Sequence, residues 1–85
     1  MSEEIYVLGI VIDGRDNTAP EVQKVLTRYG SRILSRNGIP DPTGSRGIIT
    51  VTMQADHDVS QRIQHDLTSI GGVQARAFSL SEPLA

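Results

Sequence analysis

Apolar and polar positions along this chain follow one pattern that occurs twice, with an offset of 41 residues. Residues 5–13 (IYVLGIVID) form a strand-like run, and residues 47–54 (GIITVTMQ) begin the same series again. Each run is followed by apolar residues at helical spacing and then by a glycine. The aligned pairs are Ile12 with Met53, Asn17 with Asp58, Val22 with Ile63, Leu26 with Leu67, Tyr29 with Ile70, and Gly30 with Gly71. The chain therefore contains two repeats of one structural unit.

This pattern predicts four strands and two helices. The strands cover residues 5–13, 32–39, 47–53 and 73–80, and the helices cover residues 19–29 and 58–70. The order β-α-β, β-α-β is the split βαβ plan. We therefore predict one α+β domain over residues 1–85, with its ordered core at about 4–80. Its expected architecture is a ferredoxin-like βαββαβ sandwich, in which a four-stranded antiparallel sheet carries both helices on one face.

Local signals indicate where the elements begin and end. Thr18 and Glu21 match a capping box, so the first helix is expected to start directly after Thr18. Gly30 is expected to end that helix in the left-handed conformation. Asp58 is the expected N-cap of the second helix. Gly38, inside the second strand, indicates a bulge or a close backbone approach.

Composition excludes several classes of protein. The 85 residues include no Cys, which excludes disulfides, iron–sulfur clusters and Cys-ligated zinc. Two Tyr, one Phe and a net charge of −2 do not suit a base-stacking or phosphate-binding surface, so no direct nucleic-acid contact is expected. No apolar run approaches the ~20 residues of a membrane span. No leader is recognised before the first strand, so we expect a cytoplasmic protein.

The first strand is apolar on both faces, and Tyr6, Leu8 and Ile10 lie on one of them. A strand of this kind is usually covered on both sides, whereas two helices cover only one face of a four-stranded sheet. We therefore expect the chain to associate with itself, as a dimer or tetramer, through Tyr6, Leu8 and Ile10. Arg36 is a charge within the second strand, and it is expected at the interface or at a guarded sheet edge. The alternative is a central strand with ordinary partial exposure.

The candidate ligand site is the turn between the first strand and the first helix. It consists of Asp13, Gly14, Arg15, Asp16, Asn17 and Thr18. Backbone N–H groups at a helix start can hold an anion. Arg15 adds positive charge, and Asp13 or Asp16 can hold an amine. A small amphoteric molecule such as an amino acid suits this mixture, and the alternative is a capped loop without a ligand.

Neither catalysis nor a bound cofactor is indicated. His57 and His65 lie on one helix, and no Ser stands in a Gly-x-Ser-x-Gly elbow. Asp56, His57 and Asp58 are consecutive, and their side chains diverge at a helix start, so no metal site is expected there. A metal-responsive protein stays open as an alternative, with further ligands from another strand or subunit.

Several segments resemble known regulatory proteins. Residues 33–40 (ILSRNGIP), 48–52 (IITVT) and 69–73 (SIGGV) are similar to those of a short family of iron-only hydrogenase system regulators. The register of the first strand, the turn, the helix and the later Gly-Gly step resembles the wider ACT-like regulatory superfamily. The resemblance implies an ACT-like fold and a regulatory role without enzymatic activity.

This family is similar in turn to the C-terminal domain of the nickel-responsive regulator, a tetramer-forming ACT-like domain. The nickel ligands of that domain, His-x-His and Cys, would fall on Thr50, Thr52 and Asp58, so its nickel site is not expected here. Its DNA-binding segment has no expected counterpart before Ile5. The resemblance therefore implies a small-molecule-sensing transcriptional regulator that lacks its own DNA-binding segment. A pure assembly domain without a ligand is the alternative.

Overall fold

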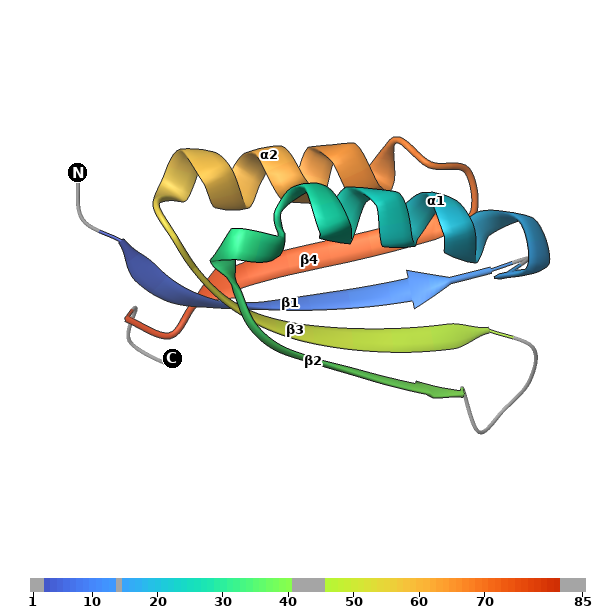
Figure 1. Cartoon of the computed structure of the whole chain (residues 1–85), viewed down its shortest axis with the longest axis horizontal. Coiled ribbons are helices and arrows are strands. Elements are labelled where there is room, and N and C mark those ends of the chain that lie inside the picture. Colours follow the sequence, from blue (N-terminus) through green and yellow to red (C-terminus); the bar gives the residue numbers. More distant parts are fainter. Residues whose placement is uncertain (1–2, 14, 41–45, 82–85) are drawn as a thin grey trace.

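Strands and helices alternate in the predicted order β-α-β-β-α-β (Figure 1). The computed structural model describes residues 3–13, 15–40 and 46–81, without the side chains of residues 15–17 and 40. The elements are β1 (Glu4–Ile12), α1 (Arg15–Arg28), the 3-10 turn η1 (Gly30–Arg32), β2 (Ile33–Pro40), β3 (Gly47–Ala55), α2 (His57–Thr68) and β4 (Val73–Ser79).

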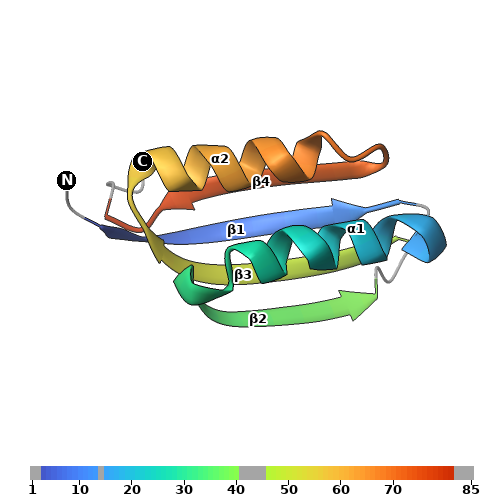
Figure 2. The same cartoon turned by 45° about the horizontal axis from the view of Figure 1, so that its top comes forward.

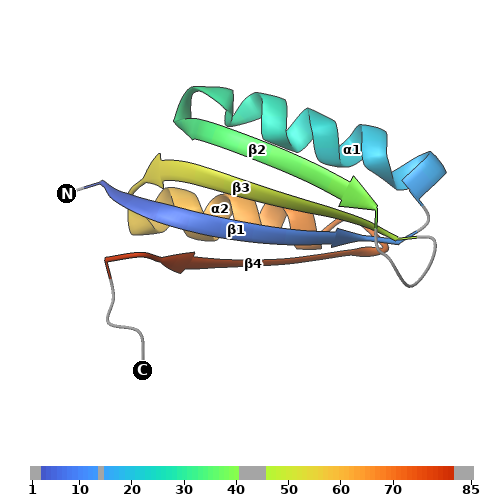
Figure 3. The same ribbon diagram turned by 90° about the horizontal axis from the view of Figure 1, so that it is seen from below.

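The four strands form one antiparallel sheet in the order β2-β3-β1-β4. The central strand β1 pairs with β3 along its whole length and with β4 over residues 6–12. Both helices cover the same face of this sheet, and the face seen in Figure 3 carries neither of them (Figure 1, Figure 2). The predicted α+β, ferredoxin-like fold is thereby confirmed. Neither of the two described helices combines the length and the apolar character that a membrane crossing requires.

The hydrophobic core fills the space between the sheet and the two helices. Its fully buried large side chains come from both halves of the chain, and they are Leu8, Ile10, Leu26, Met53, Ile63 and Leu67. Each such side chain contributes ~1.5–3 kcal/mol relative to an exposed position. The core therefore fixes both helices to one face of the sheet.

Tyr6, Leu8 and Ile10 belong to this core, which corrects their predicted role as subunit contacts. Their exposed fractions are 5%, 0% and 0%. They lie beneath the helices of their own chain, so a second molecule cannot reach them. Side chains alternate between the two faces of a strand. The residues of β1 that face away from the helices are Ile5, Val7, Gly9 and Val11.

The first helix begins at Arg15, one turn before its predicted start. Thr18 was predicted to be the N-cap, but it is a helical residue with an exposed fraction of 9%. It lies four residues before the buried Val22, so it extends the buried stripe of the helix by one turn. The prediction that Gly30 ends this helix in the left-handed conformation is also wrong. Gly30 is the first residue of η1, and its φ is not positive.

The second helix is capped by Asp56 rather than by the predicted Asp58. The Oδ1 atom of Asp56 accepts a hydrogen bond of 2.8 Å from the backbone N–H of Val59. Asp58 lies in the first turn of α2, where a negative charge interacts favourably with the helix dipole. Because α2 begins at His57, the preceding residue is the one whose side chain can reach the unpaired N–H groups.

A bulge interrupts β2 near its start, and not at the predicted Gly38. The register with β3 shifts between Ile33 and Ser35, where Leu34 is the extra residue. Gly38 pairs regularly with Ile49. A Cβ atom at Gly38 would lie 3.9 Å from the carbonyl oxygen of Ile48, which is an ordinary contact.

The connection between α2 and β4 depends on a left-handed glycine. Gly72 has a φ of 84°, and its carbonyl oxygen accepts a hydrogen bond of 2.7 Å from the backbone N–H of Asp13. A Cβ atom at this position would lie 3.0 Å from the backbone oxygen of Asp13. Both the backbone conformation and the close approach therefore favour glycine.

The cap assignment predicts that Asp56→Ala lowers the free energy of unfolding by about 1 kcal/mol, because the N–H of Val59 loses its partner. Urea unfolding followed by circular dichroism measures this change. Asp58→Ala is the matched control, and its expected loss is less than half as large. A greater loss for Asp58→Ala than for Asp56→Ala would contradict the assignment.

Gly72→Ala is expected to lower the free energy of unfolding by about 1–2 kcal/mol, because an L-residue is strained in the left-handed region. The neighbouring Gly71→Ala is the control, since a Cβ atom there meets nothing within 4 Å. Thermal unfolding of the two variants measures the difference. Equal stabilities would show that the left-handed turn is not a constraint.

Candidate functional site

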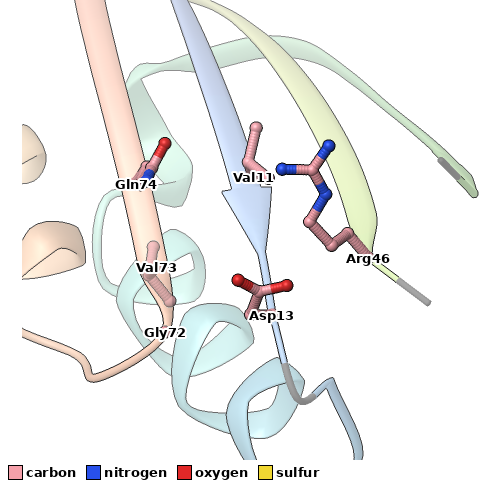
Figure 4. A pocket seen from close by; sticks show the side chains of 6 residues that line it. All are labelled: Val11, Asp13, Arg46, Gly72, Val73 and Gln74. Atoms are coloured by element: carbon pink, nitrogen blue, oxygen red, sulfur yellow. The ribbon is translucent and has the colours of Figure 1, made fainter. Parts of the chain in front are cut away.

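The candidate site lies at the end of the sheet where β1 ends and where β3 and β4 begin. A cavity of about 200 Å³ opens there. Its lining comes from three neighbouring strands and their connections, and consists of Val11, Asp13, Arg46, Gly72, Val73 and Gln74 (Figure 4). The hydrogen bond between Asp13 and Gly72 joins two of these connections and fixes the backbone at the cavity wall.

The cavity combines opposite charges with an amide. Asp13 projects from the chain directly after β1, and Arg46 reaches from the start of β3 toward Val11 (Figure 4). Gln74 adds a side-chain amide from β4, which both donates and accepts hydrogen bonds. A carboxylate and a guanidinium on one cavity can bind an ammonium group and a carboxylate of the same small molecule.

The structure retains part of the predicted turn in this site. Asp13 lines the cavity, whereas the buried Thr18 does not. Gly14 lies outside the described residues. Arg15, Asp16 and Asn17 lie in the first turn of α1, and their side chains are likewise outside the described part of the chain. Their role in ligand binding stays a prediction.

Arg46 and Gln74 were missed in the sequence. The signal that could have found them is strand register. Gly47 pairs with Ile12, so the next residue pair outward is Arg46 with Asp13. Gln74 pairs with Val11 on the other side of β1. Once β1 is recognised as the central strand, both side chains are expected beside Asp13.

Arg36, predicted at an interface or a sheet edge, lies on the edge strand β2. It pairs with the buried Val51, so it lies on the helix side of the sheet. Its guanidinium donates a hydrogen bond to the side-chain oxygen of Gln23 on α1. The side chain therefore contacts a helix of its own chain, and its part in a subunit interface stays a prediction.

A second polar cluster joins the two helices away from the cavity. The Tyr29 hydroxyl donates a hydrogen bond of 2.6 Å to Asp66, and Arg28 lies 3.5 Å from the same carboxylate oxygen. Burial raises the pKa of the Tyr29 phenol above its usual value, and the hydrogen bond to Asp66 acts in the same direction. Because these groups bind one another, we assign the cluster to helix packing.

Metal ligands do not gather in the described part of the chain. No group of three or more His, Asp or Glu side chains is placed there to hold an ion. At the start of α2, Asp56 is engaged in capping, while His57 and Asp58 are exposed. The metal-responsive alternative, with further ligands from another subunit, stays a prediction.

Comparisons with known proteins agree with this architecture. The sequence profile of a family described as "TM1266-like: Iron-only hydrogenase system regulator, putative" matches residues 4–77. Among solved structures, the uncharacterized protein TM1266 from Thermotoga maritima is similar with a TM-score of 0.89 and 26% sequence identity. That match covers 94% of this chain and 100% of the other. A search of curated proteins finds no significant match.

An unknown protein from Galdieria sulphuraria is also similar, with a TM-score of 0.69 and 15% sequence identity. The match covers 98% of this chain and 48% of the Galdieria chain, and at this identity it shows a shared fold alone. The family profile, in contrast, runs from the first residue of β1 into β4 and includes Asp13, Arg46 and Gln74. The chain therefore belongs to the TM1266-like family.

Proposed function

We propose that the chain is a regulatory module that senses a small amphoteric molecule, such as an amino acid, at the Asp13–Arg46 cavity. The family description supports the regulatory role. The observation that carries the ligand proposal is the presence of a carboxylate and a guanidinium on one cavity of about 200 Å³. In this arrangement Asp13 binds the ammonium group of the ligand, Arg46 binds its carboxylate, and Gln74 hydrogen-bonds to either.

The size of the cavity limits the ligand. Sites for drug-sized molecules usually enclose about 300–1,000 Å³. A cavity of about 200 Å³ suits a smaller molecule, of the size of a single amino acid. The lining also includes the apolar side chain of Val11, which can contact the aliphatic part of such a ligand.

The position of the cavity suggests how a bound ligand acts. Its residues belong to three strands that meet at one end of the sheet, so a ligand holds the ends of β1, β3 and β4 together. A ligand shifts a conformational equilibrium only as far as it binds one state better than another. We propose that the bound state is the one in which these strand ends are held in the register seen here.

Titration of the full chain with the standard L-amino acids, followed by amide chemical shifts, tests this proposal. At least one amino acid is expected to shift the amide signals of Asp13 and Gln74. Asp13→Asn and Arg46→Gln are each expected to weaken binding about 10- to 100-fold, because each removes a charge-assisted hydrogen bond. The matched controls Asp58→Asn and Arg62→Gln make the same charge changes on α2. Absence of any shift, or equal losses in the controls, would contradict the proposal.

We propose self-association through the open face of the sheet as a second candidate function. Two large apolar side chains of this face are at least half exposed, namely Ile39 (50%) and Phe78 (54%). A sheet of four strands spaced ~4.8 Å apart and about eight residues long presents a flat area of roughly 500 Å². Because stable interfaces use about 800 Å² per partner, a dimer would need the whole face together with contacts at its edges.

The self-association proposal predicts that the chain sediments as a dimer or larger species at micromolar concentration. Phe78→Glu is expected to shift it to the monomer, because a carboxylate would have to be buried in the interface. Gln61→Glu is the control, since it introduces the same charge on an exposed position of α2. A wild-type chain that sediments as a monomer at all concentrations would exclude this candidate.

A further inference from the structure

The open face of the sheet contains a hollow at its centre. Strand register aligns Asn37, Thr50, Gly9 and Arg76 in one row across β2, β3, β1 and β4. Gly9 stands in the middle of the central strand, where glycine is unfavourable because it has no side chain to pack. A Cβ atom there would meet nothing within 4 Å, so the space above Gly9 is open. A cavity of about 290 Å³ occupies it.

Arg76 lines this hollow and places a positive charge beside it. Among the described residues its guanidinium has neither a hydrogen bond nor an ion pair. Within the rows that strand pairing places on the open face it is the only charged side chain, since its neighbours there are Gln74, Phe78, Thr50 and Asn37. The hollow therefore combines an apolar floor with one cation that has no partner of its own.

The hollow adjoins the Asp13–Arg46 cavity. Val11 and Gln74 line both spaces. Arg46 enters from the β3 side of β1, and Arg76 enters from the β4 side. Along β1, the row of Gly9 and Arg76 precedes Asp13 by four residues, which is roughly 13 Å at ~3.3 Å per residue.

We propose that Arg76 and the hollow above Gly9 form a subsite for a second acidic group of the ligand. This inference rests on the proposed function, because it places the amphoteric end of the ligand at Asp13 and Arg46. The acidic group, a carboxylate or a phosphate, is carried on a side chain that passes over Val11. The ligand class is therefore an α-amino acid with an acidic end several bonds from its α-carbon.

The missing side chain of Gly9 and the charge of Arg76 support this assignment independently. Any larger residue at position 9 would fill the space that the ligand chain needs, so the hollow depends on glycine. A guanidinium binds a carboxylate or a phosphate through two parallel hydrogen bonds.

Three probes of matched length test the subsite by amide chemical-shift titration of the full chain. They are L-2-aminoadipate with an acidic end, L-2-amino-5-phosphonopentanoate with a phosphonate end, and L-norleucine with a methyl end. The two acidic probes are expected to bind about tenfold more tightly than norleucine, and they alone should shift the amide of Arg76. Tighter binding of the phosphonate probe than of the carboxylate probe would favour a phosphate as the acidic group of the ligand.

Two variants separate the subsite from the rest of the site. Arg76→Gln is expected to remove most of the tenfold preference and to leave norleucine binding unchanged. Gly9→Val, which suits a strand, is expected to weaken all probes whose chain crosses the hollow. Arg62→Gln on α2 is the control for loss of one positive charge.

The outcomes distinguish this inference from the proposed function. Equal binding of all three probes, lost in Asp13→Asn and unchanged in Arg76→Gln, would overturn the subsite and leave the amphoteric site intact. A uniform loss for all probes in Arg76→Gln would also overturn it, because the effect would then be a general change of charge. If none of the probes binds at millimolar concentration while another amino acid does, the subsite is again overturned. If no amino acid binds at all, both proposals fail.

Discussion

The hydrogen bonding of β1 to two neighbours at once is the constraint on which the rest of this structure depends. Because β1 pairs with β3 on one side and β4 on the other, its alternation of side chains assigns every paired residue of those strands to a face. Its even-numbered residues pack beneath the helices, and its odd-numbered residues form the floor of the open face. Asp13 follows this strand directly, so the position of the candidate cavity follows from the register of β1.

Much of this fold could be predicted from the sequence, because apolar residues recur at every second position in a strand and at every third or fourth position in a helix. The two stripes that contain Val22 and Ile63 were sufficient to find both helices, and the split βαβ plan placed them on one face. Helix ends were less predictable. The capping box at Thr18 is a local signal, and the helix overrides it by burying Thr18 in line with Val22. Asp56 and Asp58 are chemically equivalent candidates, and only the helix start decides between them.

The candidate site was less predictable than the fold, for a physical reason. Sequence reasoning found Asp13, because it follows the first strand directly. Arg46 and Gln74 lie 33 and 61 residues away from Asp13, and strand pairing alone brings them to the same cavity. The choice of face for Tyr6, Leu8 and Ile10 failed similarly. A strand that is apolar on both sides does not reveal which side its own helices cover.

The strand order β2-β3-β1-β4 has a consequence for the twofold repetition of the chain. β1 and β2 belong to the first repeat and β3 and β4 to the second, and every ladder in the sheet joins one repeat to the other. Neither repeat can therefore build any part of the sheet from its own strands. A polypeptide of half this length could complete the same layer only by intertwining with a second molecule. The present chain is, in its topology, a covalently linked pair of such halves.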